Sequence, residues 1–72
     1  MLSYVEKYAS QFGFEKLHES DRYKHYVKRE GHEIVMMLYK LHSKYVTFIE
    51  NHVEKKVKAS DLALAVLYNE NV

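Results

Sequence analysis

The chain has 72 residues, 47% of them hydrophobic and 29% charged, with a formal net charge of +1. A chain of this length builds one small core, so we expect a single domain spanning residues 1–72. It contains no Cys, which excludes disulfides and thiolate metal sites and fits a reducing, cytoplasmic location. The balanced charge gives no argument for nucleic-acid binding from bulk electrostatics.

Several functional classes are disfavoured by what the sequence lacks. No apolar run approaches the ~20 residues of a membrane span, and the first residues do not resemble a secretory signal. Only two Gly are present, too few for a glycine-rich phosphate-binding loop. The five His are all at least seven residues apart, which does not suit a zinc site. We therefore expect no membrane association, no metal, no cofactor and no catalytic activity.

The first element is predicted to be a helix over residues 3–12. Leu2, Val5, Ala9 and Phe12 recur at spacings of three and four, which places them in one apolar stripe. Ser3 is a suitable N-cap with Glu6 three residues later, and Gly13 follows where a helix would end. The next segment, FEKLHES, is ambiguous between core closure and the lead into a strand.

Three strands are predicted next, over residues 22–28, 33–41 and 44–50. Polar and apolar residues alternate in the first of these, and Gly31 suits the loop that follows it. The second is apolar on both sides, and the third is rich in β-branched and aromatic residues. One alternative is a single long helix across residues 33–53, because Ile34, Met37, Leu41, Lys44 and Phe48 also have helical spacing.

The end of the chain is predicted to be a second helix over residues 61–69, capped by Ser60 or Asp61. This helix is apolar nearly all round, which predicts burial on more than one side. The segment NHVEKKVKA before it is a loop or an extra edge strand. The fold class is therefore α+β, with order α-β-β-β-α and a three-stranded antiparallel meander.

Strand alternation divides the side chains of the sheet between two faces. If Lys28 pairs with Glu33 and Leu41 pairs with Lys44, one face of the sheet is the one on which we expect the helices to pack. Its residues are Tyr23, His25, Val27, Ile34, Met36, Leu38, Tyr45, Thr47 and Ile49. The opposite face then keeps an apolar and aromatic patch, which we interpret as an interaction surface. Its members are Tyr26, Val35, Met37, Tyr39, Val46 and Phe48. The alternative is one helix on each face, a three-layer monomer with no exposed patch.

A second hypothesis is nucleic-acid binding, because Lys or Arg alternates with Tyr over residues 22–28 and aromatic rings stack on bases. The candidate contacts are Arg22, Lys24, His25, Lys28 and Lys44.

The segment GFEKLHESDRYKHYVKREGHEIVMML, after a short helix, is similar to the HicA-type mRNA-interferase toxins. That resemblance implies a domain like those that bind double-stranded RNA, with His25 in the place of a catalytic His. The family has Gly-Ser-His-His where this chain has Arg-Tyr-Lys-His, and its second strand is less apolar.

The preferred interpretation is a small non-enzymatic interaction protein that binds a protein partner, or itself as a homodimer. The nucleic-acid module, including a small ribonuclease toxin, is the alternative, and a structural subunit of a larger assembly is the third. Nine of the eleven basic residues are Lys and seven residues are Tyr, residues with AT-rich codons. This usage suggests a low-GC bacterium or its phage, and hence a phage- or mobile-element-encoded modulator of a host protein.

Overall fold

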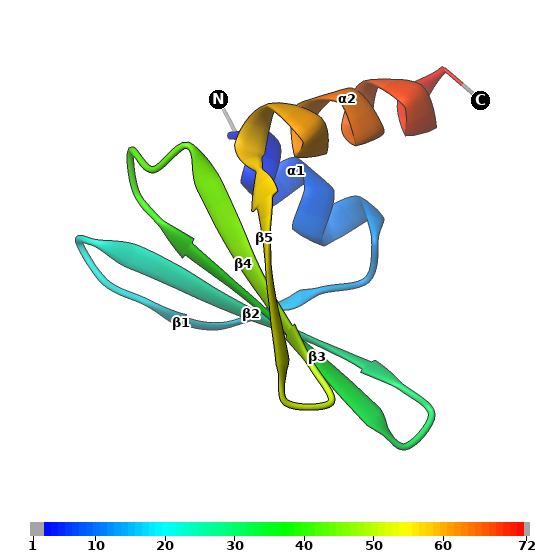
Figure 1. The fold of residues 1–72 in the computed structure, drawn as a ribbon. Coiled ribbons are helices and arrows are strands. Elements are labelled where there is room, and N and C mark those ends of the chain that lie inside the picture. The colour runs from blue at the N-terminus through cyan, green and yellow to red at the C-terminus, as the bar shows by residue number, and fades with distance from the viewer. Residues whose placement is uncertain (1–2, 72) are drawn as a thin grey trace.

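The computed structural model describes residues 3–71 and shows a small compact α+β domain (Figure 1). Along the chain, one helix precedes a run of five strands and a second helix follows it. The elements are α1 (Tyr4–Gln11), β1 (Glu15–Glu19), β2 (Tyr23–Glu30), β3 (Glu33–Lys40), β4 (Tyr45–Glu50), β5 (Val53–Lys58) and α2 (Ala59–Glu70).

The strands form one antiparallel meander in the order β1-β2-β3-β4-β5. The α+β class and the meander topology are confirmed, and the alternative of a long helix over residues 33–53 is wrong. The expected number of three strands is wrong, because β1 and β5 add one strand at each edge; in NHVEKKVKA the edge strand, and not the loop, is the alternative that the structure shows. Every residue of β1 is exposed, and Val57 is the only residue of β5 that is not. Neither edge strand therefore carries the burial alternation that identifies a strand in sequence.

The observed register places the side chains on the two faces that alternation predicts. The β3–β4 pairing is the expected one, with Met36 opposite Ile49. The β2–β3 hairpin closes at Glu30 and Glu33, so Lys28 lies opposite Val35 and not opposite Glu33. This difference shifts the pairing by two residues, and an even shift leaves every side chain on its predicted face.

Helix α1 begins and ends as its sequence predicts. The Glu6 backbone N–H donates to the Ser3 hydroxyl at 3.2 Å, which caps the first turn. At the other end Gly13 adopts a φ of +81°, and the Phe14 N–H donates to the Ala9 carbonyl at 2.8 Å. These features form a Schellman-type ending that turns the chain directly into β1.

Helix α2 differs from its prediction in its start and in its burial. It begins directly after β5, with Lys58 at the N-cap position, so Ser60 and Asp61 lie inside the first turn. Only Leu62 and Val66 are buried, whereas the large apolar residues on its other side are exposed. Those residues are Leu64, Leu67 and Tyr68. Neither helix of residues 3–71 is long and apolar enough to cross a membrane.

Both helices lie on the same side of the sheet, which gives two layers and not three (Figure 1). The core joins Val5 and Ala9 of α1 and Leu62 of α2 to side chains of the sheet. Its sheet residues are Tyr26, Met37 and Val46, with Tyr39, Phe48 and Val57 packed around them. The helices therefore cover the face opposite to the one expected. The covered face is unbroken across Tyr26, Met37 and Phe48, whereas His25 and Thr47 interrupt the other face.

The β4–β5 hairpin contains a local strain that a single substitution should relieve. Its loop residues Asn51 and His52 both have positive φ, at 52° and 64°, as a type I′ turn requires. Asn tolerates this conformation, but a residue such as His pays roughly 1 kcal/mol for it. We expect His52→Gly to raise the free energy of unfolding by about 0.5–1 kcal/mol, measured by urea denaturation. No gain, or a loss, would contradict this account of the loop.

Candidate interaction surface

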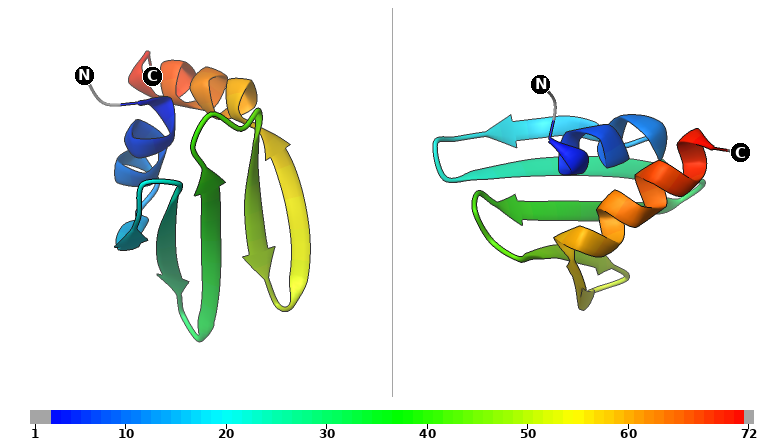
Figure 2. Two further views of the ribbon diagram at one scale, coloured as in Figure 1. Left: turned by 90° about the vertical axis from the view of Figure 1, so that its left-hand side faces the viewer. Right: turned by 90° about the horizontal axis from the view of Figure 1, so that it is seen from above.

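The sheet face opposite the helices is the candidate functional site, here called the open face. Figure 2 (left) views the strands from this side, with the helices gathered at the top of the molecule. Its outer apolar residues are strongly exposed, with Ile34 at 52%, Tyr45 at 48% and Tyr23 at 40%. Val27, Met36, Leu38 and Ile49 are half-buried, although they lie on the strands that carry the core on their other side. Such a contiguous apolar surface is typical of an interaction site.

The strand pairing arranges the centre of the open face in two neighbouring rows across the sheet. The upper row places His25, Leu38, Thr47 and Lys56 side by side on β2, β3, β4 and β5. The lower row places Val27, Met36, Ile49 and Glu54 on the same four strands. The lower row is aliphatic across β2 to β4, whereas Leu38 is the one aliphatic residue of the upper row, and each row ends in a charged residue on the edge strand β5.

A small cluster of rings occupies the β1–β2 side of this face. The Tyr23 and His25 rings stack with centroids 4.9 Å apart, and His18 lies 6.0 Å from His25 and 6.1 Å from Tyr23. Among the described residues, no carboxylate accepts a hydrogen bond from the His25 ring. The cluster therefore contributes flat, semi-polar contact area to the open face.

Two shallow hollows lie at opposite ends of the open face. One is at the end where β3 and β5 finish, and its lining includes Tyr23, His25, Leu38, Lys40, Tyr45 and Lys56. The other lies by the β2–β3 and β4–β5 turns, and its lining includes Ile34, Met36, Ile49, His32 and His52. Between them the apolar rows form a continuous surface without a deep pocket, which suits a flat partner more than a small molecule.

The residues expected to form an interaction patch lie instead beneath the helices. Tyr26, Val35, Met37 and Val46 are buried, and Met37 and Val46 are 0% exposed. Tyr39 and Phe48 are half-buried and pack against the core. The Phe48 ring lies 6.1 Å from the rings of Tyr8 and Phe14, which come from α1 and the segment after it. This patch is the core of the domain and not a free surface.

The candidate nucleic-acid contacts are divided among separate parts of the surface. Lys24 and Lys28 lie on the helix-covered face, where Lys24 pairs with Glu6 and Lys28 pairs with Glu30 at 2.8 Å. His25 lies on the open face, in the upper row. Arg22 and Lys44 are exposed in the turns before β2 and β4. The five residues therefore do not form one basic surface.

Lys24 ties three elements together beneath the helices. Its amino group donates to the Glu6 carboxylate of α1 and lies 3.6 Å from a Glu19 oxygen of β1. The hydrogen bond to Glu6 raises the pKa of Lys24 above its usual 10.5, against an opposing effect of burial. Next to it, burial raises the pKa of Tyr26, whose buried hydroxyl has no hydrogen-bond partner among the described residues. This polar cluster is structural, because it lies between the helices and the sheet, and the sheet separates it from the open face.

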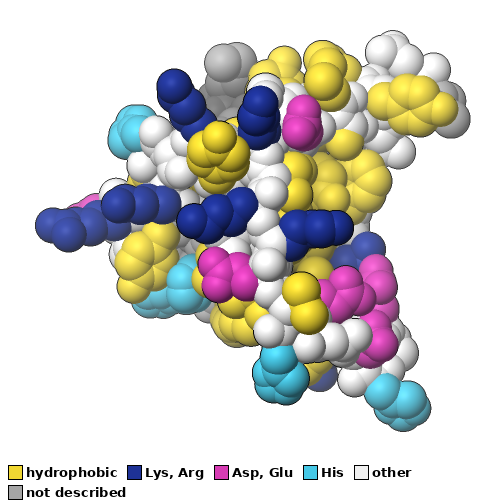
Figure 3. Space-filling model, in the orientation of Figure 1, with side chains coloured by type: hydrophobic (Ala, Val, Ile, Leu, Met, Phe, Trp, Pro, Cys, Tyr) yellow, Lys and Arg dark blue, Asp and Glu magenta, His cyan; other side chains and the backbone are white. Residues whose placement is uncertain are grey.

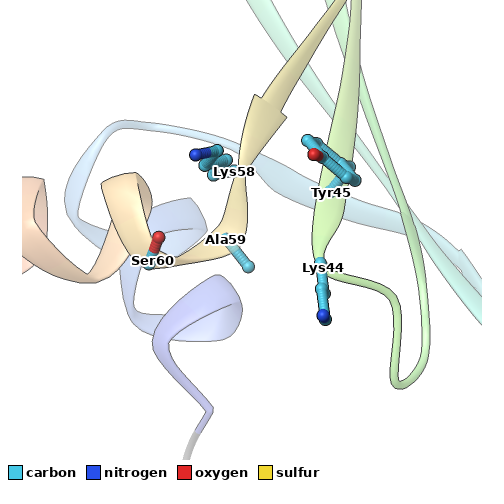
Figure 4. A pocket seen from close by; sticks show the side chains of 5 residues that line it. All are labelled: Lys44, Tyr45, Lys58, Ala59 and Ser60. Atoms are coloured by element: carbon cyan, nitrogen blue, oxygen red, sulfur yellow. The ribbon is translucent and has the colours of Figure 1, made fainter.

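A further pocket lies where α2 begins, between the start of β4 and the end of β5 (Figure 4). It is lined by Lys44, Tyr45, Lys58, Ala59 and Ser60. The amino groups of Lys44 and Lys58 point in different directions, so they do not converge on a common anion (Figure 4).

Within residues 3–71, no group of three or more His, Asp or Glu side chains is arranged to hold a metal ion.

The sequence predicted the residues of the open face but assigned the helices to it, because both faces of the sheet carry a similar number of apolar residues. The signal in the sequence that marks this face is its charged residues, with Lys40 and Lys56 towards one end and Glu54 towards the other. No protein-family model, no curated protein and no solved structure matches this chain.

Proposed function

We propose that this chain is a small non-enzymatic domain that binds another protein through its open face. The observation that carries the proposal is the run of half-buried aliphatic residues Val27, Met36, Leu38 and Ile49, which no other part of residues 3–71 covers. Interface cores are depleted in charged residues and enriched in aromatic residues and Met, and a polar rim surrounds them. Lys40, Lys56 and Lys58 supply such a charged margin on the open face.

The proposal is tested by using the chain as bait in a cell extract, with and without nuclease. Three baits are compared: the wild type, Leu38→Asp on the open face, and Lys55→Glu on the opposite side of β5. We expect the wild type and Lys55→Glu to retain the same proteins, or a second copy of the chain, after nuclease treatment. Leu38→Asp should lose them, because an Asp in the centre of an apolar interface is left desolvated. Equal retention by all three baits, or no retained protein, would contradict the proposal.

A second candidate function is supported by one feature of the same face. Tyr23 and Tyr45 flank Lys40 in the hollow at the end of β3, and aromatic rings beside Lys suit single-stranded nucleic acid. Recovery that disappears with nuclease and falls steeply with salt would favour this candidate over protein binding.

A further inference from the structure

The charged residues of the open face are separated along the strand direction. Lys40, Lys56 and Lys58 lie in the half where β3 and β5 end. Glu15, opposite Val27, and Glu54, opposite Ile49, lie in the other half, where Arg29 is the basic exception. Glu30, Glu33 and Glu50 close the same end of the sheet, but they lie on the helix-covered face, where Glu30 pairs with Lys28. In Figure 3, where the open face is turned to the left, the visible Lys and Arg side chains lie mainly in the upper half of the view and most Asp and Glu lie below them.

These charges are available to a partner. Within residues 3–71, the intrachain ion pairs join Lys16, Lys24 and Lys28 to glutamates. None of those pairs involves Lys56 or Glu54, and both side chains are exposed on the open face. Lys56 in one half of the face and Glu54 in the other are therefore free to pair with charges of a partner.

This pattern is complementary to itself in one orientation. A second copy facing the first can be related to it by a two-fold axis that lies between the faces. An axis along the strands would lay the Lys-rich half of one copy over the Lys-rich half of the other. An axis across the strands, between the two rows, lays the upper row of each copy over the lower row of the other. Lys56 then faces Glu54 of the second copy, and Leu38 faces Met36 of the second copy.

The size of the face also suits a second copy. The whole domain measures 30 × 30 × 19 Å, so an interface on its broad side has at most several hundred Å² of surface on each copy. A standard protein–protein interface uses about 800 Å² from each partner. Packed sheets lie about 10 Å apart with strand directions within about 30°, a gap that Lys and Glu side chains can bridge from both sides.

We propose that two copies of this chain pack open face to open face with antiparallel strands, around a two-fold axis across the strands. Lys56 of each copy pairs with Glu54 of the other, and the apolar rows form the centre. The inference rests on the proposed function, since it assigns a second copy as the protein that the open face binds.

Sedimentation equilibrium of charge-swapped variants tests both the dimer and its orientation. We expect wild type to be a dimer at roughly 100 μM, and Glu54→Lys or Lys56→Glu to weaken association roughly tenfold, because each places like charges together twice. The double variant Glu54→Lys/Lys56→Glu should recover the wild-type dimer, since the pairs are re-formed with reversed sign. Lys55→Glu, on the other side of β5, should leave association unchanged.

A wild type that stays monomeric at that concentration overturns the dimer. A dimer that the single swaps do not weaken, or that the double variant does not recover, overturns the antiparallel arrangement. Circular dichroism of each variant confirms that it is folded before it is compared. If the wild type is monomeric while the bait experiment still recovers proteins that depend on Leu38, the dimer fails and the protein-binding function stands. If neither is seen, both fail.

Discussion

Replacing Met37 with Asp is expected to unfold the chain, whereas the same replacement at the neighbouring Met36 should leave it folded. Met37 is 0% exposed on the central strand β3 and belongs to the core. Met36 points to the open face and is half-buried. A carboxylate at position 37 would be buried without a partner, at a cost that exceeds what a small domain can tolerate.

Alanine variants at the same two positions should remain folded, so their free energies of unfolding can be measured and compared. We expect Met37→Ala to lower the free energy of unfolding by about 2–5 kcal/mol, out of roughly 4–11 kcal/mol for a chain of this length. Met36→Ala should cost less than about 1 kcal/mol in dilute solution, where association does not contribute. Urea denaturation followed by circular dichroism gives both values. Equal losses at the two positions would mean that the sheet is covered on both faces.

The second large effect is expected at Lys24. Its side chain is 12% exposed and links Glu6 of α1 to Glu19 of β1. Lys24→Ala leaves the Glu6 carboxylate, whose side chain is 23% exposed, without its cation. We expect a loss of about 1.5–3 kcal/mol in the free energy of unfolding, the range for hydrogen bonds to charged groups. Lys44→Ala, at an exposed position, is the matched control and should change stability by less than about 0.5 kcal/mol.

The same cluster predicts a loss of stability at alkaline pH. The pKa of Lys24 is raised in the folded state by its hydrogen bond to Glu6, and the pKa of Tyr26 is raised by burial. A group with a raised folded pKa stabilises the fold below its unfolded pKa, and this stabilisation is lost as the pH rises through the folded value. The unfolding free energy should therefore fall above the ordinary values of 10.0 for Tyr and 10.5 for Lys.

Urea denaturation from neutral pH into this alkaline range checks the effect. The double variant Lys24→Ala/Tyr26→Phe should have a flatter alkaline profile, because it removes both groups. An unchanged slope in that variant would assign the alkaline loss to other residues.

Alternation and turn residues were sufficient to predict the two faces of the sheet and the ends of α1. They worked because successive side chains of a strand point to opposite faces, and because Ser3 and Gly13 have conformational roles that few residues fill. The edge strands could not be identified in the same way. β1 pairs with one strand, β2, and this pairing has a register shift between Lys16 and His18. None of the residues of β1 is buried.

The choice of face depended on contacts that are distant in sequence. Both faces of β3 are apolar, so its sequence alone does not decide which side receives the helices. In the folded chain, Tyr26 and Met37 meet Val5 and Ala9 of α1, and Lys24 reaches Glu6 on the same helix. The ion pair is possible only when α1 lies on the side of Lys24, Tyr26 and Lys28. Pairings of this kind, 18 or more residues apart, are set by the tertiary structure and not by local pattern.

The sidedness of the sheet is tested most directly by comparing the rates at which hydrogen peroxide oxidises Met36 and Met37. Tandem mass spectrometry distinguishes the two sulfoxides in one peptide, and oxidation follows exposure of the thioether. In dilute, folded protein we expect Met36 to be oxidised well before Met37, which is 0% exposed, and both to react alike in urea. Faster oxidation of Met37 than of Met36 in the folded chain would show that the helices cover the other face, and would contradict the assignment of the open face as the binding surface.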